Sequence, residues 1–299
     1  MKDAVEGTDD QFRAQIEPIR VSLLDLVEQT RGLRETAAFL PAADSPAMDE
    51  LAQEPAFAGA WAKEPVRDAH STSWLFLNGA EDLITAMCRL FADPTPTVYA
   101  HVVLARSALE CCARAAWLAE PGIGVKRRVA RGLNERLYSL AEQAKLPGAP
   151  QDPERRRRIL DEAKRQSFAR LSSGSQSVVA LEERRKGGTA IVKWLFENAQ
   201  VDLGEVVYRF WSSVAHGTIY GLVQSLDPHV PQAHGLDSLT TVGMAVRTDQ
   251  VQSVMAAAGI AYAEVGRVHR QLFGWRCDDW DRTMVNFLQS LRTSPALRP

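Results

Sequence analysis

Apolar residues recur every three or four positions in nearly every segment of this chain, and this spacing restricts the fold more than any other feature. It places apolar side chains along one face of an α-helix. No strand–helix–strand alternation and no repeat of fixed length accompanies it. The sequence therefore predicts an all-α protein, a helical bundle with an N-terminal helical extension. Asp9 or Asp10 is expected to cap the first helix, and Ser71 or Ser73 the second. The expected helices cover residues 10–30, 74–91, 98–120, 125–144, 154–169, 189–198, 206–226, 249–273 and 278–291.

Composition changes along the chain and predicts two regions. Acidic residues outnumber basic ones near the N-terminus, and the four prolines among residues 39–68 favour an irregular connection. We expect an acidic N-terminal helix and irregular connection over residues 1–68, followed by the main helical bundle over residues 69–299. Ser and Gly make residues 171–190 the expected mobile segment. Residues 228–246 are expected to form either a short strand pair or a loop.

The totals favour an ordinary globular protein of a reducing compartment. The 45% hydrophobic and 24% charged shares argue against disorder. The four cysteines contain no C-x-x-C pair, so we expect free thiols and no disulfide framework. The N-terminus has no apolar signal region, and no run of about 18 apolar residues occurs. The expected location is therefore cytoplasmic, with no membrane partner.

Polar side chains interrupt the apolar face of residues 206–226, and they are the first candidates for chemistry. Arg209 and His216 lie two helical turns apart, roughly 10 Å along the axis. Arginine binds phosphate and histidine transfers protons near neutral pH, which suffices to cleave RNA when the 2′-hydroxyl is the nucleophile. The alternative is structural: His216 bonds Ser212 or Ser213 inside the core, and Arg209 pairs with an acidic neighbour.

A second polar line runs down the most apolar expected helix. Arg106, Glu110 and Arg114 are spaced four residues apart and so share one face. Burying three charges costs several kcal/mol unless they pair with one another. The line is therefore either an ion-pair ladder that fixes helix register or part of a site shared with His216. A small-molecule enzyme would line a bundle-core pocket with these residues and Trp211.

These segments resemble known helical proteins. Arg, six residues, then His on a late helix resembles the motif of the HEPN superfamily, whose helical domains occur in toxins, phage-defence proteins and RNA-processing factors. The segments A-R-S-A-L-E, V-A-R-G-L-N-E-R-L and Y-R-F-W-S-S-V-A-H-G are similar to a group of uncharacterised actinobacterial helical proteins. The HEPN resemblance implies a homodimer in which Arg209 contacts the scissile phosphate, His216 acts as acid or base, and Glu110 orients one of them. Phe210 replaces the polar residue that follows the Arg in many HEPN motifs, which leaves a catalytically silent relative as the alternative.

The expected function is therefore RNA binding, or cleavage as an endoribonuclease without metal or cofactor, in a toxin or defence component. The alternatives are a non-enzymatic helical module that binds a small anionic ligand or a protein, and a small-molecule enzyme. A nuclease predicts His216 in an open basic groove, a bracing role predicts His216 buried with both ring nitrogens bonded, and an enzyme predicts a closed pocket.

Other clusters have simpler interpretations. The arginine-rich residues 154–158 and 182–186 are expected to be solvated helix faces, with RNA phosphate contacts as the alternative. The D-D-W-D run at residues 278–281 is typical of helix capping, and His229 and His234 lack a spaced partner cluster, so no metal site is expected. Nucleotide-binding glycine loops and the G-x-S-x-G motif are absent from the sequence.

Overall fold

The computed structural model describes residues 2–36, 40–92, 97–148, 152–171, 179–224, 233–235, 239–241, 247–276 and 278–293, and it confirms the all-α fold. Two antiparallel strand pairs occur within these residues: β1 (Arg170–Leu171) with β2 (Ala180–Leu181), and β3 (Ala233–Gly235) with β4 (Leu239–Thr241). The helices are α1 (Lys2–Arg34), α2 (Pro46–Leu51), α3 (Glu54–Phe57), α4 (Pro65–Leu90), α5 (Ala100–Ala119), α6 (Val125–Gln143), α7 (Pro153–Arg165), α8 (Gly188–Asn198), α9 (Gly204–Ala215), α10 (Ile219–Gln224), α11 (Thr248–Phe273) and α12 (Asp278–Thr293).

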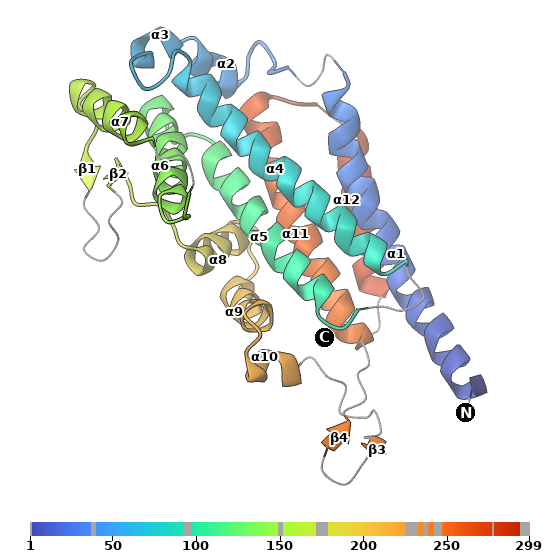
Figure 1. Cartoon of the computed structure of the whole chain (residues 1–299). Helices are drawn as coiled ribbons and strands as arrows, with labels where there is room; N and C mark the ends of the chain where they lie inside the picture. Colours follow the sequence, from blue (N-terminus) through green and yellow to red (C-terminus); the bar gives the residue numbers. More distant parts are fainter. Residues whose placement is uncertain are drawn as a thin grey trace.

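Helix α5 lies at the centre of the bundle, with α4 and α11 on one side and α8 and α9 on the other (Figure 1). It is central because its side chains are mostly small or apolar, so neighbouring helices approach it closely on several sides. Helices α1 and α12 pack together and against α11 on the far side. The main core formed by these helices includes Ile19, Leu26, Ile84, Leu109, Trp117, Leu195, Trp211, Tyr262 and Phe287.

A second core lies at one end of the bundle, between α6, α7 and the β1–β2 pair. Trp61, Val129, Leu133, Ile159 and Leu181 are among its buried residues. It joins the main bundle where α6 crosses α4.

Buried arginines of α6 attach this second core to the end of α5. Arg128 is fully buried; it pairs with Glu50 and donates to the carbonyl oxygens of Leu118 and Glu120 at 2.5 and 3.0 Å. Arg131 donates to the carbonyl oxygen of Trp117. The last carbonyls of a helix lack intrahelical donors and carry partial negative charge. The α6 arginines therefore cap the C-terminus of α5.

Two expected helix starts are wrong. The first helix begins at Lys2 rather than at a cap near residue 10, and it continues through Pro18. Helix α4 begins at Pro65, earlier than expected. Ser73 lies within that helix, where its hydroxyl contacts the carbonyl oxygen of Ala115 at 2.8 Å. A Ser signals a cap only when the preceding residues cannot continue the helix, and here they continue it.

The segment 206–226 is broken into two helices, which corrects the single helix that was expected. Helix α9 ends at Ala215 because Gly217 has a φ of +65°, a left-handed conformation that terminates helices. Helix α10 then starts in a new direction, and Ile219 is 82% exposed. The apolar face of α9 therefore does not continue into α10.

The segment between β2 and α8 also differs from expectation, since residues 182–186 form no helix and are held by ion pairs. Glu183 accepts hydrogen bonds from Arg127 at 2.8 Å. Arg185 donates to Glu135 at 2.8 Å and its guanidinium lies 3.7 Å from the centroid of the Tyr138 ring. Residues 182–186 therefore form a connection held by charged side chains of α6, and not the solvated helix face that was expected.

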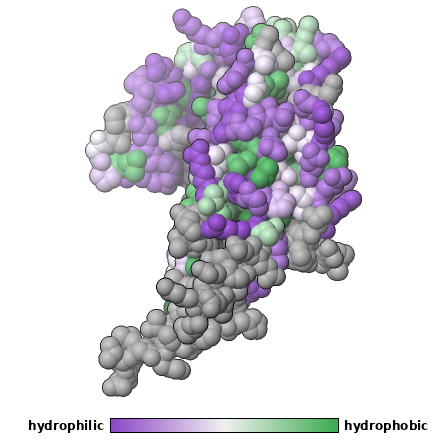
Figure 2. All heavy atoms as spheres, turned by 90° about the vertical axis from the view of Figure 1, so that its right-hand side faces the viewer, coloured by the Kyte–Doolittle hydropathy of each residue, from purple (hydrophilic) through white to green (hydrophobic). Residues whose placement is uncertain are grey.

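The surface mixes polar and apolar areas. Figure 2 looks onto the side where α1 lies and shows hydrophobic residues near the middle of that face, bordered by hydrophilic ones. Exposed apolar side chains on the outer helices include Val21, Val285 and Leu288. In the described part of the chain, no helix combines the length and the apolarity needed to cross a membrane.

Candidate functional site

Helix α9 carries most of the predicted site residues, and its amphipathic pattern decides which of them face the core. Tyr208, Trp211 and Val214 are buried at spacings of three residues. Trp211 belongs to the main core. Arg209, one position after Tyr208, is exposed, because successive helical side chains are about 100° apart.

A half-buried polar cluster joins α9 to α5. The Arg106 guanidinium donates through Nε to Ser212 Oγ at 3.0 Å, and through Nη2 to Tyr208 Oη at 2.9 Å and Glu110 Oε1 at 3.2 Å. The Tyr208 hydroxyl also donates to Glu110. Each member thus binds another member. We call these four residues, Arg106, Glu110, Tyr208 and Ser212, the Arg106 cluster.

The N-terminus of α8 closes the Arg106 cluster. At Gly188 a Cβ atom would lie 2.3 Å from Tyr208 Oη and 2.6 Å from Glu110 Oε1, so a larger residue here would force these side chains to move. Glu110 therefore lies against a helix N-terminus, where negative charge is favoured. Neither Tyr208 nor Gly188 was among the predicted site residues. Tyr208 could have been recognised as the first residue of the Y-R-F-W-S-S motif. Nothing in the sequence around Gly188 indicates its role.

Arg114, expected on the same polar line, belongs to a different network. It is buried and donates to Glu135 of α6 at 2.9 Å, while Arg185 binds the other oxygen of that carboxylate. Burial lowers the pKa of Arg114 despite the Glu135 carboxylate beside it. The polar line of α5 therefore divides: Arg106 and Glu110 contact α9, whereas Arg114 contacts α6.

Arg209 lies on the surface of α9. Its side chain is 67% exposed and forms an ion pair with Glu205, one turn earlier, at 2.9 Å. Lys193 of α8 approaches the same carboxylate at 3.2 Å. Hydrogen bonds from Lys193 and then Arg209 lower the pKa of Glu205. Lys193 also lies 4.0 Å from the Glu197 carboxylate. This exposed corner therefore holds two cations and two carboxylates.

His216 is also exposed, because it is the residue that ends α9. Its backbone N–H donates to the carbonyl oxygen of Ser212 at 2.9 Å. Both serines expected as its partners bind elsewhere: Ser212 accepts from Arg106, and the Ser213 hydroxyl donates to the carbonyl oxygen of Phe210 at 2.6 Å. The bracing role predicted that His216 would be buried with both ring nitrogens hydrogen-bonded, and this prediction is wrong because His216 is exposed.

The cluster and the exposed pair are separate. Glu110 hydrogen-bonds Arg106 and Tyr208 and forms no hydrogen bond to Arg209 or His216, so it does not orient either of them here. Both Arg209 and His216 are exposed, and Arg209 is paired with Glu205, as the structural alternative expected of an acidic neighbour. A guanidinium and an imidazole so placed can bind an anion and transfer a proton, respectively.

In the described part of the chain, no group of three or more His, Cys, Asp or Glu side chains is placed to hold a metal ion. Asp279 and Asp281 of the D-D-W-D run pair with Arg282 and Arg270. His229 and the side chain of His234 lie outside the described residues.

Comparison with known proteins adds no assignment. No family model, no curated protein and no solved structure matches this chain. Function must therefore be inferred from the side chains and their surroundings.

Proposed function

We propose that this chain is a HEPN-like protein that binds RNA and cleaves it without a metal, through Arg209 and His216 on the exposed side of α9. One observation carries the proposal: both side chains are exposed, and the only bond that the described residues give to either side chain is the surface ion pair of Arg209 with Glu205. Ser212 and Glu110, which were expected to contact them, are bound to Arg106 instead. The arrangement leaves the phosphate-binding and proton-transferring groups accessible.

Arg209 would bind the scissile phosphate. Its present partner is Glu205, and an exposed ion pair of this kind contributes only about 0–1 kcal/mol. A phosphate can accept two parallel hydrogen bonds from one guanidinium and so can replace the carboxylate. Binding RNA here would therefore break only the weak ion pair between Arg209 and Glu205.

His216 would transfer the proton. As a general base it takes the proton from a ribose 2′-hydroxyl, whose oxygen attacks the adjacent phosphorus and expels the 5′-oxygen of the next nucleotide. The products are a 2′,3′-cyclic phosphate and a 5′-hydroxyl, and the leaving oxygen takes up a proton. The Arg106 cluster positions α9 from behind without touching the reacting atoms.

A second copy of the chain would complete the site. Large apolar side chains are exposed on α9, on α10 and just before α9: Leu203, Val206, Ile219, Tyr220 and Val223. Contiguous exposed apolar side chains are typical of protein interfaces, and we infer that these residues contribute to one. We expect a homodimer formed through this surface, dissociated by Val206→Glu and Ile219→Asp in sedimentation velocity runs.

The same apolar surface favours a second candidate function, a helical module that binds another protein without catalysis. The two functions differ in one respect that can be measured directly. A binding module retains its partner when His216 is replaced by alanine, and it never cuts RNA.

The deciding experiment compares wild type with His216→Ala and Arg209→Ala on mixed cellular RNA in excess chelator. We expect both variants to lose cleavage by a factor of about 10² or more, with unfolding free energies within about 0.5 kcal/mol of wild type. Arg165→Ala is the matched control, since Arg165 is also an exposed arginine paired with a glutamate on its own helix. A wild type that does not cut RNA would refute the nuclease proposal.

A further inference from the structure

A groove opens between α11, α12 and the short connection that follows α8. Its volume is about 400 Å³, within the size range of small-molecule sites. Its charged lining residues are Glu264, Arg267, Arg270 and Asp281. The other described residues of its lining are apolar: Ala199, Val201, Ile260, Ala263, Trp280, Met284, Phe287 and Leu288. A mainly apolar lining with a few polar groups is typical of ligand sites.

The way α12 packs on α11 leaves this space open. At Gly266 a Cβ atom would lie 2.1 Å from the Trp280 ring, and at Gly259 one would lie 2.0 Å from the Phe287 ring. The two rings therefore rest directly on the α11 backbone and mark the two ends of the groove. Ala263 follows Gly259 by four residues and precedes Gly266 by three, so it shares their face of the helix. It offers only a methyl group to the groove between the two rings.

The charged residues gather near the Trp280 end, and they are paired with one another. Arg267 donates to the Glu264 carboxylate at 2.8 and 2.5 Å, and Arg270 Nη1 donates to Asp281 at 2.6 Å. Asp281 and Arg267 remain open to solvent, with side chains 73% and 50% exposed. Among the described residues, this end of the groove therefore presents two guanidinium groups and two carboxylates, with no excess of either charge.

This balance of charge favours an uncharged head group. A carboxylate placed here would face Asp281, and an ammonium group would face Arg267, so each would meet a like charge. A carboxamide or hydroxyl group both donates and accepts hydrogen bonds. It can therefore bond to a guanidinium and to a carboxylate together, and it leaves both ion pairs intact.

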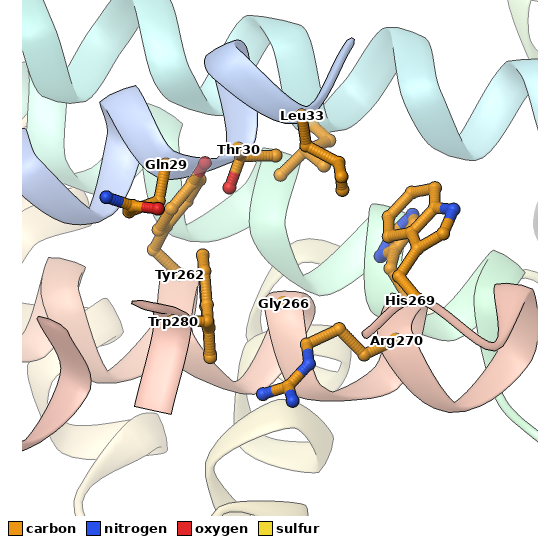
Figure 3. Close-up of a pocket in the computed structure, with 10 residues that line it drawn as sticks. Gln29, Thr30, Leu33, Tyr262, Gly266, His269, Arg270 and Trp280 are labelled. Atoms are coloured by element: carbon orange, nitrogen blue, oxygen red, sulfur yellow. The ribbon is translucent and has the colours of Figure 1, made fainter. Parts of the chain in front are cut away.

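A neighbouring cavity is too small to be the binding site. Figure 3 shows it between α1 and α11, lined by Thr30, Tyr262, Arg270 and Trp280 among others. Its volume is about 20 Å³, enough for roughly one water molecule. Arg270 and Trp280 border both spaces, and of the two only the groove has room for a ligand.

We propose that the groove binds an uncharged amphiphile that has a carboxamide or hydroxyl head and an aliphatic body. The head lies at the Trp280 end, between the Arg267 and Asp281 side chains. The body lies along the apolar residues toward Phe287, where it contacts Met284 and Leu288. None of the residues that line the groove belongs to α9, so this inference does not depend on RNA cleavage.

The experiment titrates octanamide, octanoate and octylamine into the full chain at pH 7 by calorimetry. We expect octanamide to bind at least about tenfold more tightly than either charged probe. Asp281→Asn removes one exposed carboxylate and leaves an excess of positive charge, so it should tighten octanoate at least about threefold and change octanamide less than about twofold. Leu288→Gln should weaken octanamide about tenfold, because it removes apolar contact with the body.

Val285→Gln is the matched control, because Val285 is also an exposed apolar residue of α12 and does not line the groove. It should bind octanamide like wild type. The proposal is overturned if wild type binds none of the probes, if a charged probe binds as tightly as octanamide, or if folded Leu288→Gln binds octanamide with wild-type affinity. It is also overturned if Leu288→Gln converts a dimer to a monomer in sedimentation velocity, since a second copy of the chain would then occupy the groove.

Discussion

At the scale of single residues, two histidines inside the bundle are held neutral by their surroundings. Burial lowers the pKa of both His101 and His269 to about 4. No charged group stabilises the protonated form of His101. Its ring packs against the Phe91 ring, and its Nε2 has no hydrogen-bond partner. His269 lies among aromatic rings and contacts Ser73 at 2.8 Å.

These shifts predict that acid destabilises the fold. The unfolded histidines have pKa values near 6.5, so between pH 6.5 and 4 the unfolded chain binds more protons than the folded chain. Stability is therefore complete above that range and falls as the pH is lowered through it, by about 2 kcal/mol per histidine from pH 7 to pH 5. Urea unfolding of wild type and His101→Phe at the two pH values checks this. Equal pH dependence in both proteins would contradict it.

The ion pair at the proposed RNA site gives a second prediction at this scale. Glu205→Gln removes the carboxylate that Arg209 and Lys193 share. Arg209 is then available to phosphate, while Lys193 keeps Glu197 as a neighbour. We expect single-stranded RNA to bind up to about fivefold more tightly, equivalent to about 1 kcal/mol. Fluorescence anisotropy with labelled RNA measures the change.

The control is Glu154→Gln, which alters the net charge equally but frees Arg157 on α7 instead. If both variants bind RNA with the same affinity, the effect is one of overall charge and not of Arg209.

At the scale of helices, the contact of α12 with α11 depends on glycine. Replacing a helical glycine by alanine normally stabilises a helix by about 1 kcal/mol. At Gly266 and Gly259 the added methyl group would instead meet the rings of Trp280 and Phe287. We expect Gly266→Ala and Gly259→Ala each to lower the free energy of unfolding by about 1–3 kcal/mol.

Gly32→Ala is the control, because no atom lies within 4 Å of the Cβ position at this exposed glycine of α1. It should stabilise the protein slightly. Chemical denaturation of the three variants tests the sign as well as the size of the effect, and stabilisation by Gly266→Ala would show that α12 does not rest on α11 as described.

At the scale of the whole molecule, α1 is part of the main core. Ile16, Ile19, Leu23 and Leu26 are buried against the rest of the bundle, and α1 packs along both α11 and α12. Removing residues 1–34 would expose the apolar faces of both helices. Burying a single leucine or isoleucine contributes about 1.5–3 kcal/mol, so the loss of four, about 6–12 kcal/mol, is comparable to the whole net stability of a typical domain, about 5–15 kcal/mol.

We therefore expect residues 35–299 alone to lose cooperative thermal unfolding and to bind a hydrophobic dye. Calorimetry of the truncated chain checks this. A sharp transition within a few degrees of that of the full chain would mean that the N-terminal helix is an independent extension.

The sequence by itself determined the fold class and most of the helices, because helical periodicity is a local property of neighbouring side chains. It placed α5, α6, α8 and α11 to within a few residues. It also identified Arg106 and Glu110 as polar residues of the central helix, since charges on an apolar helix stand out without knowledge of their partners.

Only the tertiary structure decided which polar residues meet. Pairings such as Arg106 with Ser212, or Arg114 with Glu135, join residues far apart in the chain and depend on how the helices cross. The break at Gly217 likewise set the exposure of His216, and a glycine's left-handed conformation is not visible in apolar spacing. Burial and pairing depend on how the assembled helices pack. The candidate residues could therefore be identified from the sequence, whereas their contacts could be identified only from the tertiary structure.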